Sequence, residues 1–183
     1  MSYEIRPVRA EEWPQVKDLR LAALQDPVAP QAFLETYDQA LARPDGFWQD
    51  RAAGNSHGTA ARQFVAVAGD GSWAGTCVAL VEEAGGEDFF GAAIAQRQAH
   101  LVGVFVRPEH RGRGLVEGLF GAAVEWAFSL DGLERVRLHV HEDNARAEAA
   151  YRKIGFERSG RAVPFKGDPS VRELEMELKK PER

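Results

Sequence analysis

The feature that most constrains the fold is a strand, a helix and a second strand between His100 and Val140. The run His100–Val106 is almost entirely apolar, which is typical of a strand covered on both faces. Apolar residues recur every three or four positions over Leu115–Phe128 and predict an amphipathic helix. The segment Val136–Val140 alternates between apolar and polar residues and predicts the second strand. This order predicts two parallel strands joined by a right-handed crossover.

The flanking segments predict further strands and helices around this unit. Helical periodicity predicts helices at Trp13–Ala23, Phe33–Leu41, Gly46–Ala53 and Asn144–Ile154. We expect the Asp26-Pro27 and Ala29-Pro30 pairs to end the first of them. Apolar runs and alternation predict strands at Tyr3–Val8, Gln63–Ala68, Trp73–Val81, from Phe156 onward, and at Glu173–Leu178.

Three details of this pattern bear on a binding site. Gly103 inside the apolar strand predicts a bulge or a close backbone approach. The segment Glu82–Gln96 is either a substrate-facing loop or a disordered insertion. Strict alternation of acidic and apolar residues over Glu173–Leu178 predicts an antiparallel strand with one wet face.

Composition favours one folded domain spanning residues 1–183. The chain is 44% apolar and 28% charged, and its single cysteine, Cys77, lies in an apolar run where we expect it to be core. No stretch reaches the ~20 apolar residues that cross a bilayer, and the first residues lack a signal peptide's apolar core. We therefore expect a cytoplasmic protein without a membrane partner. The net charge of −5 disfavours a nucleic-acid partner.

The loop between the predicted strand and helix is locally basic. From Arg107 to Arg113 it holds three arginines and one glutamate, and it ends in glycines at a helix start. Free amides and the positive end of a helix dipole bind anions, and glycines let a diphosphate approach the backbone. The alternative is an ordinary glycine turn flanked by solvated arginines.

This loop resembles the acetyl-CoA pyrophosphate loop of the GCN5-related N-acetyltransferase (GNAT) family. The family pattern is Gln or Arg, two residues, Gly, one residue, then Gly or Ala, and it maps onto Arg111, Gly114 and Val116. Val116 departs from the pattern, and its branched side chain could crowd the diphosphate. A second family signature resembles the residues Leu138-His139-Val140, Asn144, Ala147, Tyr151, Gly155 and Phe156.

The resemblance, which spans about residues 101–156, implies a fold and an activity. The implied fold is α/β (α+β): a mixed, mostly antiparallel twisted sheet with a central parallel strand pair and flanking helices. The implied activity is direct transfer of an acetyl group from acetyl-CoA, the cosubstrate, to a primary amine of a small molecule or peptide. Some relatives pair as homodimers through their sheets. The implied cofactor-binding residues are Val104, Phe105, Val106, Arg111, Gly112, Arg113, Gly114, Leu115, Val116, Glu117 and Asn144.

Two residues are the catalytic candidates. Tyr151 matches the family tyrosine near the cofactor sulfur and is the expected general acid, although in isolation it would be a packing aromatic. His100 begins the central strand where some members carry a catalytic glutamate, and it is the candidate base or else a strand-end histidine bonded to backbone. His139 and His141 share a strand face without a third ligand nearby, so we expect no metal.

Two rival functions remain open from the sequence. Gly112, Gly114 and Gly118 at a helix start also fit a dinucleotide-binding enzyme, although five residues separate the strand from Gly112 where that fold needs a tight turn. A non-catalytic acyl-CoA sensor would retain the fold without turnover. The acceptor amine is not defined, and its possible contacts are Trp48, Phe89, Phe90 and Phe165.

Overall fold

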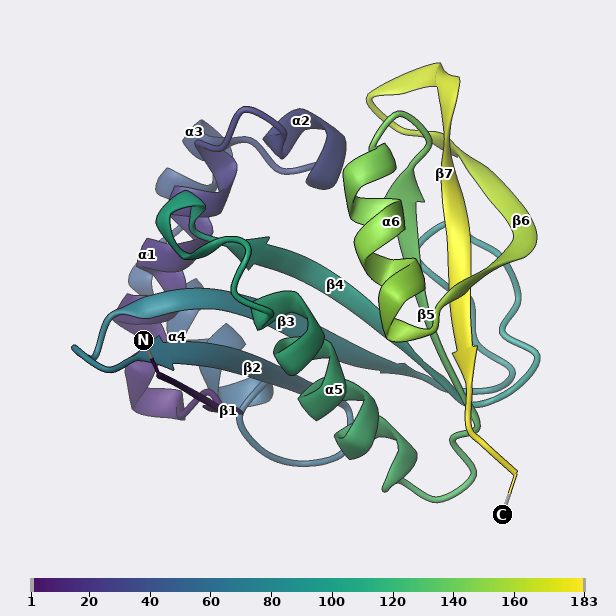
Figure 1. The fold of residues 1–183 in the computed structure, drawn as a ribbon, viewed down its shortest axis with the longest axis horizontal. Helices are drawn as coiled ribbons and strands as arrows, with labels where there is room; N and C mark the ends of the chain where they lie inside the picture. The colour runs from purple at the N-terminus through teal and green to yellow at the C-terminus, as the bar shows by residue number, and fades with distance from the viewer. Residues whose placement is uncertain (1, 183) are drawn as a thin grey trace.

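The protein, described here from a computed structural model, is built on one mixed sheet with helices on both faces (Figure 1). The structure describes residues 2–182, so Met1 and Arg183 of the expected domain lie outside the described residues. The strand order is β1-β2-β3-β4-β5-β7-β6, and all neighbours are antiparallel except the pair β4 and β5. The strands are β1 (Tyr3–Pro7), β2 (Ala61–Ala68), β3 (Trp73–Glu82), β4 (Gln98–Val106), β5 (Arg135–His141), β6 (Glu157–Phe165) and β7 (Asp168–Lys179).

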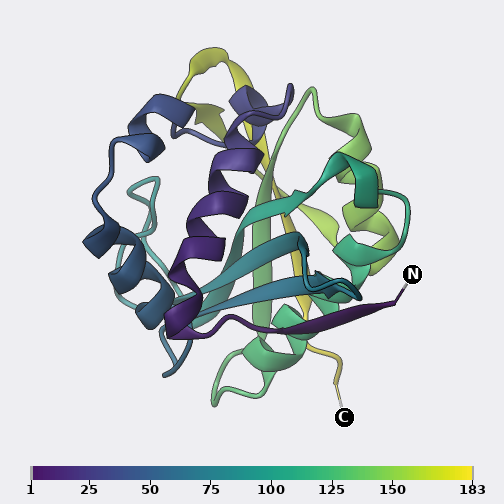
Figure 2. The same ribbon diagram turned by 90° about the vertical axis from the view of Figure 1, so that its left-hand side faces the viewer.

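The helices separate into two groups. The elements are η1 (Ala10–Glu12), α1 (Trp13–Leu24), α2 (Ala29–Ala32), α3 (Tyr37–Leu41), α4 (Asp45–Gly54), η2 (Pro108–His110), α5 (Leu115–Phe128) and α6 (Ala145–Ile154). Helices α5 and α6 cover one face of the sheet, and α1 with α4 covers part of the other (Figures 1 and 2). The crossover predicted between the central parallel strands is α5.

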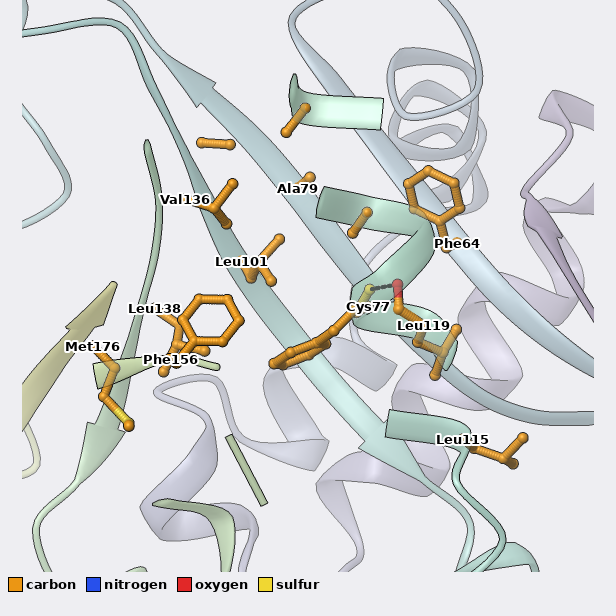
Figure 3. Close-up of a cluster of buried hydrophobic side chains, with 14 of the residues drawn as sticks. Phe64, Cys77, Ala79, Leu101, Leu115, Leu119, Val136, Leu138, Phe156 and Met176 are labelled. Atoms are coloured by element: carbon orange, nitrogen blue, oxygen red, sulfur yellow. Dashed lines mark hydrogen bonds between the residues drawn. The ribbon is translucent and has the colours of Figure 1, made fainter. Parts of the chain in front are cut away.

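The larger hydrophobic core lies between the sheet and α5 (Figure 3). Leu119 and Phe120 of α5 are fully buried in this core, and each buried aromatic or aliphatic side chain contributes about 1.5–3 kcal/mol. Cys77 of β3 is fully buried here, and its thiol donates to the Leu119 carbonyl at 3.5 Å. The expectation that Cys77 is a core residue is confirmed.

A second core lies on the opposite face, under α1 and α4. It contains Leu19 of α1, Val65 of β2, and Trp48 of α4. Trp48 has no exposed surface, so its interpretation as a possible acceptor contact is wrong. Its indole packs edge-on against Phe47, with ring centroids 5.1 Å apart.

The central strand β4 contains an extra residue relative to β3. Thr76 pairs with Phe105, but Val78 pairs with Val102, so the register shifts at Gly103, whose φ is +62°. This conformation favours glycine, and the bulge was predicted at this residue. Strands β4 and β5 pair only at Ala99 and His100 and then diverge.

Two predictions about secondary structure are wrong. The helix expected at Phe33–Leu41 begins only at Tyr37, as α3, because Phe33 is extended (φ −134°, ψ 142°) after α2 and Thr36 starts α3 by accepting a hydrogen bond from the Gln39 amide. Helix α1 ends at Leu24, shortly before the Asp26-Pro27 pair, as expected. Pro30 instead lies near the start of α2, where proline is tolerated, so the Ala29-Pro30 pair does not end α1.

The acidic face of β7 is not a wet face. Glu175 is only 2% exposed, because β5 and β6 flank β7 and arginines of β5 contact its carboxylate. In the part of the chain that the structure describes, no helix has the length and apolar character needed to cross a membrane.

Candidate functional site

A cleft of about 630 Å³ opens where β4 and β5 diverge. Its walls come from the C-terminal half of β4, the loop before α5, the first turn of α5, α6, and the α1–α2 segment. The predicted residues that line it are Val104, Phe105, Val106, Arg111, Gly112, Gly114, Leu115, Val116, Glu117, Asn144 and Tyr151. The fold thus brings together strand, loop and helix positions chosen from the sequence.

The floor of the cleft at the start of α5 is made of backbone amides. Gly112 and Gly114 have φ values of +73° and +75°, which place consecutive amides on the concave side of the loop. Among residues 2–182 no hydrogen bond is found for the amides from Gly112 to Glu117, and the first bond of α5 runs from the Gly118 amide to the Gly114 carbonyl. These free donors fit a diphosphate.

Arg111 is fixed by the protein itself. Its guanidinium donates to Asp26 and, through Nε, to the Val106 carbonyl at 3.0 Å. Burial would raise the pKa of Asp26, but the hydrogen bond from Arg111 holds that pKa below its ordinary value. Sequence reasoning missed Asp26, because it lies far away in the chain and belongs to no motif. Arg111 therefore ties the loop to the α1–α2 segment.

The other cations of the site differ from the sequence expectation. Arg113 is exposed and does not line the cleft. Arg146 and Lys153 of α6 do line it, one near each end of that helix. Their only sequence signal was their place on the same helix as Asn144 and Tyr151.

The edge of β4 facing the cleft carries free peptide groups. The Arg107 amide donates to Ala74 of β3 at 2.8 Å, and amides alternate in direction along a strand. The amides of Val104 and Val106 therefore face away from β3, toward the gap that β5 leaves. An extended ligand could pair with this edge as an added strand.

Helix α6 places Asn144 and Tyr151 in the wall opposite β4. Asn144 caps the helix by accepting from the Ala147 amide at 3.2 Å, and Gly155 ends it with φ +116°. The Tyr151 ring stacks on Phe120, with centroids 5.2 Å apart and planes 22° apart. Burial raises the pKa of Tyr151 to about 12, so the phenol stays protonated at neutral pH.

His100 lies on the other face of the sheet, where β4 and β5 begin to part. Its Nε2 is 3.1 Å from Nδ1 of His139, so one imidazole donates to the other. Burial, with the nearby Arg137 charge, lowers the pKa of His100 to about 4. Burial and His100 lower the pKa of His139 to about 3. Both rings are therefore uncharged at neutral pH, and His100 does not line the cleft.

A buried ionic network stands beside the two histidines. Arg137 contacts both oxygens of Glu82 at 2.8 Å, Glu175 at 2.9 Å, and Asp88 at 3.0 Å. Burial would raise the pKa of Glu175, but hydrogen bonding and the neighbouring guanidinium charges lower it to about 2. The network joins β3, β5 and β7 to the loop that contains Asp88.

Within the segment Glu82–Gln96, Glu82 ends β3 and the residues after it form an ordered loop. Asp88 accepts from the Phe90 and Ala92 amides at 2.9 Å each, and the Phe90 ring lies 4.6 Å from that of His139. Phe89 is 60% exposed, with the Lys166 ammonium 3.8 Å from its ring centre. Phe165 packs edge-on against His141. Of these aromatics, Phe89 leaves the most surface free for a ligand.

The arrangement bears on two further expectations. Among residues 2–182 there is no group of three or more His, Cys, Asp or Glu side chains placed to hold a metal ion. The connection from β4 to α5 contains η2 rather than the tight turn of a dinucleotide-binding fold.

Comparisons with known proteins converge on one family description. The sequence model of the acetyltransferase (GNAT) family matches residues 13–156. A spermidine N(1)-acetyltransferase from Vibrio cholerae is 32% identical over 60 residues, which span 33% of this chain and 35% of that protein. A Bacillus subtilis protein, named as a candidate alanine N-acetyltransferase of ribosomal protein bS18, is 30% identical over 97 residues, or 53% and 55% of the two chains. The matches thus span about a third to a half of these curated relatives.

A solved structure of a GNAT-family acetyltransferase from Streptococcus pneumoniae has the same fold. The TM-score is 0.74 at 16% identity, over 97% of this chain and 99% of the other. The predicted mixed sheet with a central parallel pair is therefore confirmed.

The buried histidine pair generates a prediction about acid stability. The folded pKa of His100, about 4, lies below its unfolded value near 6.5, so the unfolded chain binds more protons between these pH values. We expect His100→Gln to reduce the loss of stability between pH 6.5 and 4 by up to about 1.4 kcal/mol per pH unit. Urea unfolding at several pH values in this range measures how steeply the free energy of unfolding changes with pH. His57→Gln, at an exposed histidine, is the control, and an unchanged slope in His100→Gln would contradict the assignment.

Proposed function

Because the chain belongs to the acetyltransferase (GNAT) family, we propose that it transfers an acetyl group from acetyl-CoA to a primary amine of a small molecule or peptide. The observation that carries the proposal is the continuity of the cleft: its free-amide floor at α5 adjoins the unpaired edge of β4. A diphosphate and an extended amide-containing arm are the two chemical parts that such surfaces bind. The curated relatives named above act, by their names, on amine acceptors.

The diphosphate is assigned to the amides from Gly112 to Glu117. Arg146 and Lys153 supply positive charge from the facing helix, while Arg111 holds the loop in shape. Arg113 is exposed to solvent, and we assign it a longer-range electrostatic attraction for the diphosphate. Val116 lies in this wall with its side chain half-buried and partly packed on the core.

The pantetheine arm is assigned to the β4 edge at Val104 and Val106, between this strand and α6. Pairing there would bring the thioester next to the bulge at Gly103. Phe105 pairs toward β3, so its contribution is the backbone that holds its two neighbours in place. Asn144 acts mainly by fixing the start of α6.

The reaction is a direct transfer between two substrates. The neutral amine nitrogen attacks the thioester carbonyl carbon, a C–N bond forms, and the tetrahedral intermediate then loses its C–S bond. The nitrogen gives up one proton and the departing sulfur gains one, so the products are an amide and the free thiol of CoA.

Tyr151 is the proposed donor to the departing sulfur. Its phenol is in the cleft wall, and in the described residues no hydrogen bond to it is found, so the proton is free to face a ligand. A pKa of about 12 keeps this proton in place until a thiolate develops. Solvent then returns a proton to the phenolate.

His100 remains the proposed base, but its role is limited to accepting a hydrogen bond. A pKa of about 4 makes its imidazole a weak acceptor, so it cannot hold the proton of an alkylammonium ion at neutral pH. Since its ring does not line the cleft, we assign His100 to accept a hydrogen bond from a water that contacts the attacking amine, while the net proton passes to solvent.

Acetyl-CoA binding tests the loop. We expect Gly114→Ala to weaken acetyl-CoA about tenfold, because an L residue at φ +75° costs about 1–2 kcal/mol and the loop relaxes away from the amide cradle. Calorimetric titration measures the dissociation constant. Gly121→Ala in α5, where an added Cβ meets open space, is the matched control and should bind like the parent. Equal affinity of both variants would remove the diphosphate from this loop.

Turnover tests the tyrosine. Tyr151→Phe removes only the proposed proton donor and retains the ring stacked on Phe120, so we expect kcat to fall about 10²–10⁴-fold with unchanged acetyl-CoA affinity. The rate is measured from the CoA thiol released in samples quenched at successive times, with the amine at saturating concentration. Tyr37→Phe in α3 is the control. Parental turnover in Tyr151→Phe would reduce the tyrosine to a packing residue.

The pH profile tests the histidine. Since His100 does not titrate near neutrality, we expect kcat/KM of the parent to rise with pH along the ionisation of the acceptor amine alone. His100→Gln should lower the curve by less than about tenfold and leave its shape unchanged from pH 6 to 9. A loss concentrated near neutral pH in this variant would instead indicate a titrating base.

A further inference from the structure

Two adjoining cavities lie on the face of the sheet opposite α5. The larger, an open recess of about 450 Å³, is lined by residues of α4 and by Val78, Leu80 and Val102 of the sheet. The smaller, of about 20 Å³, lies under α1 and reaches Gly103 at the β4 bulge. Arg51 and Val78 line both. Together the two cavities extend from α4 to Gly103, the residue beside which the thioester is proposed to lie.

Arg51 brings an uncompensated charge into this recess. Among residues 2–182 its guanidinium makes no hydrogen bond or ion pair, and it lies over the Trp48 ring at 6.0 Å from the ring centre. Its side chain is half-buried, and burial together with the Arg20 charge lowers the pKa of Arg51. A cation that is partly removed from water without a partner gains most from an anionic ligand.

The surrounding charges do not neutralise Arg51. Glu35 is shared between two other arginines: Arg20 donates to Oε2 at 3.1 and 3.2 Å, and Arg43 donates to Oε1 at 2.7 Å. Arg20 also lines the smaller cavity. Three arginines thus face one carboxylate, and Asp50 adds a single exposed negative charge in the wall of the recess.

We propose that the acceptor amine also carries a carboxylate, and that Arg51, backed by Arg20, binds this carboxylate in the recess between α4 and strands β3 and β4. The inference rests on the proposed acetyl transfer and adds its substrate class: amino-acid-like compounds. A guanidinium pairs with a carboxylate through two parallel hydrogen bonds, which fixes the acceptor's orientation as well as its position. With the carboxylate at Arg51, the amine of a short acceptor is directed along Val102 toward the bulge.

The same charges disfavour a polyamine. Like charges placed together at a binding surface oppose association, and a polyamine would bring several ammonium groups to a recess lined by unpaired arginine.

Matched acceptors test the proposal on the full chain with acetyl-CoA. Glycine, alanine, glutamate and phenylalanine are compared with their α-carboxamides and with spermidine. We expect kcat/KM to favour each carboxylate over its carboxamide by more than about tenfold. In Arg51→Gln, kcat/KM for the carboxylate acceptors should fall about 10- to 100-fold, mainly through a higher KM. The kcat/KM for the carboxamides should change less than about twofold. Arg51→Lys should recover part of the loss.

Arg152→Gln is the control, since this exposed arginine of α6 pairs with Glu148 on the other side of the sheet and the change in net charge is the same. Spermidine or the carboxamides accepted as well as the carboxylates would overturn the proposal, and so would an equal loss for both acceptor types in Arg51→Gln. If no acceptor turns over, N-acetylated products are titrated into the CoA-loaded protein. Carboxylate-specific binding that Arg51→Gln abolishes supports the proposal, and its absence overturns it.

Acetyl-CoA titration separates the two levels of inference. A chain that binds acetyl-CoA and acetylates amines without regard to the carboxylate retains the proposed function and loses only the substrate class. A chain that does not bind acetyl-CoA loses the proposed function itself.

Discussion

The extra residue in β4 at Gly103 is the constraint on which the rest of the site depends. Without it, the strand would continue its alternation and its pairing with β5. With it, Leu101 and Val104 both face the α5 side, and β4 turns away from β5 after His100. The positive φ of Gly103 makes this path accessible at low cost. One backbone irregularity thereby opens a cleft on one face and leaves the Arg51 recess on the other.

Long-range ion pairs hold the parts of the site that the sheet alone does not fix. Arg111 joins the loop before α5 to Asp26, and Arg137 joins β5 to β3, β7 and the Asp88 loop. Buried pairs contribute little net stability when intact, because desolvation offsets the attraction, but losing one partner is costly. Their value here is geometric: each fixes a loop relative to the divergent strands.

The sequence predicted those parts of the fold and site that depend on neighbouring residues, and it missed the contacts between residues far apart in the chain. The strand, basic loop and α5 helix were predictable because their periodicity and glycines are contiguous in the chain. The Asp26 contact with Arg111 spans 85 positions, and the His100 contact with His139 spans 39, so neither leaves a local signal. The wet face expected for β7 was wrong for the same reason, since the arginines that bury Glu175 come from β5. Arg51 carried no signal, because an arginine on a short helix is ordinarily a solvated residue.

The position of Cys77 has a consequence for the chemistry of thiols around this protein. The product of the proposed reaction is itself a thiol, and the chain's sole sulfhydryl lies in the core against Leu119, where burial raises its pKa to about 12. A thiolate is the reactive form, so the folded protein neither forms mixed disulfides with CoA nor consumes a thiol-trapping dye. Such a dye therefore reacts with two kinds of thiol: that of the CoA product, and that of Cys77 in chains that have unfolded.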